Sequence, residues 1–147
     1  MYLLDTNVLS ELRKAPAQMD ARVKAWTDAQ DVETLYISVI SVLEIRRGIH
    51  KLEQRGDSAQ AKIFSVWLER CVLPAFTGRI LNVDPAVALR AAVLPWANST
   101  DYRDALIAGT ALVHEAIVVT RNTKHFENSG TRLINPWGHS RRRSRLA

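Results

Sequence analysis

The sequence predicts an α/β protein: a three-layer α/β/α sandwich with a central parallel sheet. Short apolar runs alternate along the chain with stretches whose apolar residues recur every three or four positions, as in amphipathic helices. Residues 117–120 form an uninterrupted β-branched run, which is typical of a strand covered on both faces. The segments between the apolar runs are long enough for right-handed helical crossovers between parallel strands.

The first half of the chain contains three of the predicted strands. A strand ends at Leu4, and a helix capped by Thr6 and Asn7 then runs until Pro16. Met19, Val23 and Trp26 are spaced as on one helix face and predict a second helix, which is followed by a strand over residues 35–38. Helices are then expected over residues 39–55 and 58–71, the second ended by Pro74, before a strand over residues 80–83.

The second half continues the alternation. Asp84 followed by Pro85 predicts the start of a helix over residues 85–94, and a loop leads from there to Asp101. Residues 101–115 form a helix rich in small residues, which indicates close packing against the sheet. The strand at 117–120, a helical turn at 124–126 and a last strand at 132–134 complete the fold.

Composition places the chain among ordinary globular proteins. It has 147 residues, of which 47% are hydrophobic and 24% charged, and this suits one domain with a real core. Cys71 is the single cysteine, so an intrachain disulfide and a cysteine-based zinc cluster are excluded. No signal-peptide pattern or run of about 18 apolar residues occurs, so we expect a cytoplasmic protein with no membrane partner.

The formal net charge of +5 comes largely from the C-terminal end. Arg141, Arg142, Arg143 and Arg145 supply four of these charges, and the rest of the chain is nearly neutral. We therefore expect a domain over residues 1–137 and a basic, disordered tail over residues 138–147. The tail is either merely solvated or adds a salt-sensitive attraction to nucleic-acid phosphates.

Three acidic residues are candidates for a metal site: Asp5, Glu44 and Asp104. Asp5 follows the first strand, at the edge of a parallel sheet where ligands collect. Three carboxylates meeting there would repel one another and raise each other's pKa unless a cation lay among them. All-oxygen ligation favours Mg²⁺ or Mn²⁺, and such an ion supports hydrolysis of a phosphodiester.

Each acidic residue also has a purely structural explanation. Asp5 can cap the helix that follows the first strand. Ser41 and Glu44 match a capping box, although the helical periodicity already begins at Val39. Asp101 can cap the helix that carries Asp104 in its first turn.

Four segments of the chain resemble, in order, the motifs of PIN-domain ribonucleases, in particular the VapC and FitB type of toxin. They are LLDTNVLSEL at residues 3–12, SVISVLEIRRG at 38–48, DALIAGTAL at 104–112 and VTRNTKHF at 119–126. GRIL at residues 78–81 and NPW at 135–137 resemble the FitB-like branch. The likeness extends from about residue 3 to residue 137.

The resemblance implies a PIN-like fold and an Mg²⁺- or Mn²⁺-dependent endoribonuclease that is the toxin of a toxin-antitoxin pair. Asp5, Glu44 and Asp104 would bind the metal. Asn122 would be a further catalytic residue, but it is neutral where many PIN domains carry a fourth acid, so we expect one tightly held ion. The implied partners are RNA, a cognate antitoxin and a second copy of the chain in a homodimer or larger toxin-antitoxin assembly, with interfaces near residues 19–29 and 39–55.

Three small polar residues are candidates for orienting the acids or bound water: Thr6, Asn7 and Thr120. Each can equally cap a helix or end a strand. The four histidines show no pair at helical metal-binding spacing, so we expect them on the surface or in loops.

Two other functions remain open at this stage. One is a PIN-fold module that binds nucleic acid or protein and whose carboxylates are inert. The other is a phosphatase of the haloacid-dehalogenase type, which also places an Asp after its first strand. That chemistry requires a second Asp two positions later, and this chain has Asn7 there.

Overall fold

The computed structural model describes residues 1–95 and 101–138. Within these residues the sheet has five strands in the order β3-β2-β1-β4-β5, and every neighbouring pair is parallel. The strands are β1 (Tyr2–Leu4), β2 (Leu35–Ser38), β3 (Ile80–Leu81), β4 (Ile117–Val119) and β5 (Arg132–Ile134). Because β1 is central and pairs with both β2 and β4, the residues that follow these three strands lie along one edge of the sheet.

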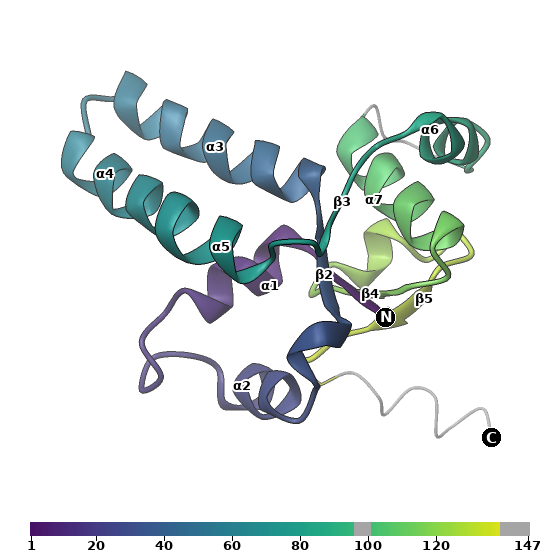
Figure 1. Cartoon of the computed structure of the whole chain (residues 1–147), viewed down its shortest axis with the longest axis horizontal. Coiled ribbons are helices and arrows are strands. Elements are labelled where there is room, and N and C mark those ends of the chain that lie inside the picture. Colours follow the sequence, from purple (N-terminus) through teal and green to yellow (C-terminus); the bar gives the residue numbers. More distant parts are fainter. Residues whose placement is uncertain (96–100, 139–147) are drawn as a thin grey trace.

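Helices cover both faces of the sheet, which confirms the predicted three layers (Figure 1). In chain order they are α1 (Thr6–Leu12), α2 (Ala21–Asp28), the 3₁₀ turn η1 (Val32–Thr34), α3 (Val39–Gln54), α4 (Ser58–Trp67), the π-helical turn η2 (Leu68–Val72), α5 (Leu73–Ala75), α6 (Pro85–Ala92), α7 (Tyr102–Val113) and the 3₁₀ turn η3 (Thr123–His125). Figure 1 shows α3, α4 and α5 on one side of the strands and α6 and α7 on the other.

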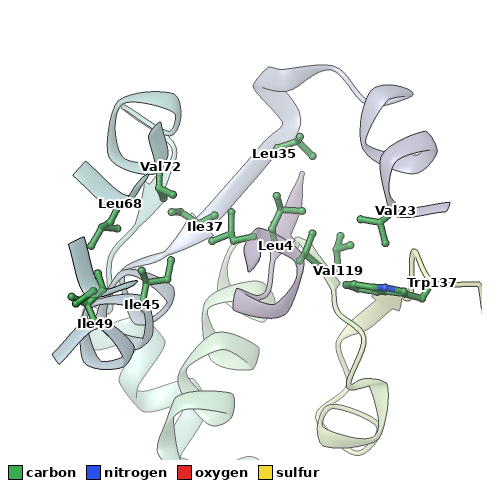
Figure 2. Close-up of a cluster of buried hydrophobic side chains, with 13 residues drawn as sticks. Leu4, Val23, Leu35, Ile37, Ile45, Ile49, Leu68, Val72, Val119 and Trp137 are labelled. Carbon is green, nitrogen blue, oxygen red and sulfur yellow. The ribbon is translucent and has the colours of Figure 1, made fainter. Parts of the chain in front are cut away.

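Alternating side chains on the central strands divide the core into two clusters, one on each face. Leu4 and Val119 pack in the first cluster, with side chains from α1 to α4, from η2 and from Trp137. Figure 2 shows Leu4, Ile37 and Val119 in this cluster. Leu3 and Val118 point to the opposite face and pack in the second cluster, with α7.

The helix starts settle the structural alternatives for all three acids. Ser38 caps α3 by accepting a hydrogen bond from the Ile40 N–H at 3.0 Å, so Glu44 lies inside the helix and the capping-box explanation is wrong. Asp101 caps α7 and leaves Asp104 in its first turn, as expected. The cap of α1 is Asp5 rather than Thr6 or Asn7, because β1 ends one residue before it.

Several predicted boundaries were wrong. Met19 precedes α2, since Asp20 caps that helix by accepting from the N–H groups of Arg22 and Val23. The helix predicted over residues 58–71 instead widens into η2, and Pro74 does not end it but lies in the short helix α5 that follows. Strand β3 stops at Leu81, two residues earlier than predicted, at the edge of the sheet where it has one neighbour.

The small residues of α7 serve two contacts rather than one. Ala108 and Ala111 face the sheet in the second cluster, as predicted. Gly109 instead lies against α6, where an added Cβ would be 2.9 Å from the carbonyl oxygen of Val87.

The loop predicted before Asp101 and the basic tail fall mainly on residues 96–100 and 139–147, outside the described residues. Across the described part of the chain, no helix combines the length and apolar character needed to cross a membrane.

Candidate active site

Asp5 directly follows β1, the central strand, and its backbone continues the pairing of β1 with the neighbouring strand β4. Its N–H donates to the carbonyl oxygen of Val119 at 2.9 Å, and its side chain is buried. Thr120 Oγ1 donates to Asp5 Oδ2 at 2.8 Å, and the Thr6 N–H donates to Oδ1 at 2.8 Å. Burial raises the pKa of Asp5 above its ordinary value, although these hydrogen bonds favour the carboxylate.

Glu44 reaches the same place from the second turn of α3. The Thr6 hydroxyl lies 3.0 Å from Glu44 Oε1 and 3.0 Å from Ser41 Oγ. Thr6 therefore contacts Asp5 through its backbone and Glu44 through its side chain. The pKa of Glu44 is raised, chiefly by burial and further by the negative charges of Asp5 and Asp104.

Asp104 comes from the first turn of α7. Its Oδ2 lies 3.1 Å from Nδ1 of His125, and its side chain is 23% exposed. Burial is the largest cause of its raised pKa, and the charge of Asp5 adds to it. We call Asp5, Glu44 and Asp104 the acidic cluster. Electrostatic repulsion acts between every pair of these three carboxylates.

The predicted small polar residues surround Asp5. The amide of Asn7 donates to Asp5 Oδ2 at 3.4 Å and to Thr120 Oγ1 at 3.3 Å. The Asn122 N–H donates to Thr120 Oγ1 at 3.0 Å. The Asn122 side chain is exposed and makes no hydrogen bond within the described residues, so it approaches Asp5 only through Thr120.

Three further residues at the site were missed by the sequence analysis. Ser41 contacts Thr6, and His125 contacts Asp104 although its side chain is 56% exposed. Arg103 places Nη1 3.9 Å from Glu44 Oε2. Ser41 and His125 lie inside the quoted motifs, and Arg103 directly precedes one, so proximity to the motifs was the available signal.

The donor set suits a hard divalent cation. The acidic cluster offers carboxylate oxygens alone. Burial is the main cause of the raised pKa values of its members, and for Glu44 and Asp104 the negative charges of the other acids add to it. Over residues 1–95 and 101–138, no three His, Cys, Asp or Glu side chains are gathered tightly enough to enclose an ion directly. Mg²⁺ commonly keeps several of its waters and uses one or two carboxylates, which an open cluster of this kind allows.

Comparison with known proteins agrees with the fold, and the similarity extends over nearly the whole chain. VapC ribonuclease Y4jK of Sinorhizobium fredii is 42% identical over 142 residues, which cover 93% of this chain and 98% of its own length. Toxin FitB of Neisseria gonorrhoeae is 38% identical over 143 residues, covering 93% and 99% of the two chains. The crystal structure of FitAcB from the same organism matches with a TM-score of 0.82 and 37% identity, over 95% of this chain and 100% of that chain.

A more distant solved structure has the same arrangement. A toxin-antitoxin complex from Klebsiella pneumoniae matches with a TM-score of 0.62 and 26% identity, over 92% of this chain and 98% of that one. The family model for the PIN domain matches residues 2–130. This chain therefore belongs to the PIN-domain family.

Proposed function

We propose that this chain is a metal-dependent endoribonuclease and the toxin of a toxin-antitoxin pair, using Mg²⁺ or Mn²⁺. The observation that carries the proposal is the acidic cluster itself: three carboxylates, one directly after β1 and the others on α3 and α7, repel one another at the carboxyl edge of the sheet. The similarity to a VapC ribonuclease and to toxin FitB supports the same activity.

Asp5, Glu44 and Asp104 would hold the metal. When bound, a divalent ion supplies a water of lowered pKa and neutralises charge on the phosphodiester undergoing hydrolysis. The chain's own contribution is to orient the acids: Thr120 and the Thr6 N–H fix the two oxygens of Asp5, and the Thr6 hydroxyl fixes Glu44. We infer that Asn122, whose side chain is exposed next to this network, would hold a water or a metal-bound group.

The proposed partners are RNA, a cognate antitoxin and a second copy of the chain. The toxin-antitoxin complex from Klebsiella pneumoniae supports an antitoxin partner. Apolar side chains that would suit a protein interface are exposed on α3 and α4, namely Leu43, Ile63 and Val66. The homodimer, its use of α2 and α3, and the cytoplasmic location remain predictions from the sequence.

The test is RNA cleavage by the purified full chain with Mg²⁺, with Mn²⁺ and with chelator. We expect cleavage of structured or single-stranded RNA only with metal, and loss of activity in Asp5→Asn. Asp57→Asn is the matched control, because Asp57 caps α4 and lies outside the site, so this variant should cleave like the wild type.

Equal cleavage by the wild type and Asp5→Asn would refute the assigned site. RNA binding without metal-dependent cleavage would instead favour the inert binding module.

A further inference from the structure

The guanidinium group of Arg103 lies beside the acidic cluster but is held mainly from elsewhere. Its Nε donates to Asp101 Oδ1 and its Nη2 to Asp101 Oδ2, each at 3.0 Å. The same Asp101 accepts the Arg103 N–H as the cap of α7. The planar group is thus clamped by two parallel hydrogen bonds, the geometry in which arginine binds most rigidly.

The remaining nitrogen, Nη1, faces Glu44 without a hydrogen bond. Its distance of 3.9 Å to Glu44 Oε2 is longer than hydrogen bonds allow, and no other acceptor lies within reach of Nη1 in residues 1–95 and 101–138. The side chain is 44% exposed. Nη1 therefore presents unused N–H donors at the rim of the acidic cluster.

Helix stability does not account for an arginine here. Arg103 is the second residue of α7, where the helix dipole disfavours a positive charge. Its ion pair with Asp101 is largely exposed, and exposed pairs contribute little to folding. A phosphate oxygen, in contrast, can accept charge-assisted hydrogen bonds from the N–H groups of Nη1.

We propose that Arg103 binds a phosphate oxygen of the RNA held at the acidic cluster, through Nη1. The inference rests on the proposed function and deepens it, because it names a residue that holds the substrate. Asp101 fixes the guanidinium before RNA arrives, so little side-chain freedom is lost on binding. Arg103 also adds a positive charge on the substrate side of a site that otherwise repels phosphate.

The experiment measures kcat and KM for a short single-stranded RNA at a series of KCl concentrations with fixed Mg²⁺. In Arg103→Gln we expect KM to rise about tenfold with kcat changed only a few fold, because one charge-assisted contact to bound RNA is lost. The slope of log KM against log salt should fall by about 0.7, the value for one phosphate contact to a single strand.

Arg55→Gln is the charge-matched control. Arg55 caps the far end of α3, roughly 16 Å along the helix from Glu44, so its removal should leave KM and the salt slope unchanged. An Arg103→Gln variant that loses thermal stability but keeps the wild-type KM and slope would overturn the proposal, as would equal changes in both variants.

Arg103→Lys decides the matter if Arg103→Gln does not fold. Lysine keeps the charge but lacks the guanidinium that Asp101 fixes in place, so the salt slope should remain while KM rises. A wild-type KM in Arg103→Lys would overturn the proposal. Absence of RNA cleavage by the wild type would count against the proposed function itself, and is therefore distinguishable.

Discussion

Replacing Thr120 by Val should destabilise the fold in a pH-dependent way. Thr120 is completely buried, and its hydroxyl donates to Asp5 while accepting hydrogen bonds from Asn7 and Asn122. Valine has a similar shape but cannot donate, so Asp5 loses one of its hydrogen bonds while staying buried. The lost bond also favoured the carboxylate, so the pKa of Asp5 should rise further.

The expected magnitude follows from the charge of the acceptor. A hydrogen bond to an ionised group contributes about 1.5–3 kcal/mol, and a neutral one about 1 kcal/mol. At pH 8, where the carboxylate form of Asp5 is more favoured than at low pH, Thr120→Val should lower the free energy of unfolding by about 2 kcal/mol, or roughly 4–8 °C in Tm for a domain of this size. At pH 4 the raised pKa shifts Asp5 toward its protonated form, and the loss should shrink toward about 1 kcal/mol.

Urea unfolding followed by circular dichroism at both pH values measures this effect. Thr110→Val is the matched control, because Thr110 is equally buried but its hydroxyl donates to the neutral carbonyl oxygen of Leu106 at 2.7 Å. Its loss should be about 1 kcal/mol at either pH. The same pH-independent loss in both variants would refute the idea that Thr120 stabilises a buried carboxylate.

Three further predictions concern stability and the tail. The pKa values of the acidic cluster are raised in the folded protein, so as the pH rises the unfolded chain loses these protons before the folded chain does, and the wild type loses stability. Without metal, the stability of Asp5→Asn relative to the wild type should therefore increase as the pH rises from about 4 to 8. A difference in Tm that does not depend on pH would contradict this. Gly109→Ala should cost about 1–3 kcal/mol in urea unfolding, because its Cβ would press on Val87, whereas Gly48→Ala, with open space in α3, should be neutral or stabilising by up to about 1 kcal/mol. Removing residues 139–147 should leave turnover of a short oligonucleotide within a few fold, and a collapse in activity would show that the tail takes part in binding.

Local sequence signals determined the strands and most helix starts. The apolar runs before Asp5 and over residues 117–119 form strands because they must be buried on both faces, and this holds whatever lies beside them. Asp84 and Asp101 cap their helices as predicted, since capping depends on neighbours two or three residues away. The position of Asp5 at a strand's carboxyl end followed from the same local pattern.

The contacts within the site depended on the tertiary structure. Thr6 meets Glu44 across 38 residues and Thr120 meets Asp5 across 115, because β1 lies between β2 and β4 in the sheet. Sequence spacing does not encode that strand order. His125 was expected on the surface or in a loop, and it does lie exposed in the turn after β4, but its contact with Asp104 was not predicted. The sequence around Arg103 did not indicate that this side chain lies beside Glu44, since that contact depends on where α7 packs against α3.

The sequence by itself thus determined which residues are acidic, which segments are apolar and where β1, β2 and β5 stop. Strand order and helix packing decided which polar groups face which carboxylate. The physical reason is that burial and capping act over a few residues, whereas hydrogen bonds and repulsion at the site join segments that only the folded sheet makes neighbours.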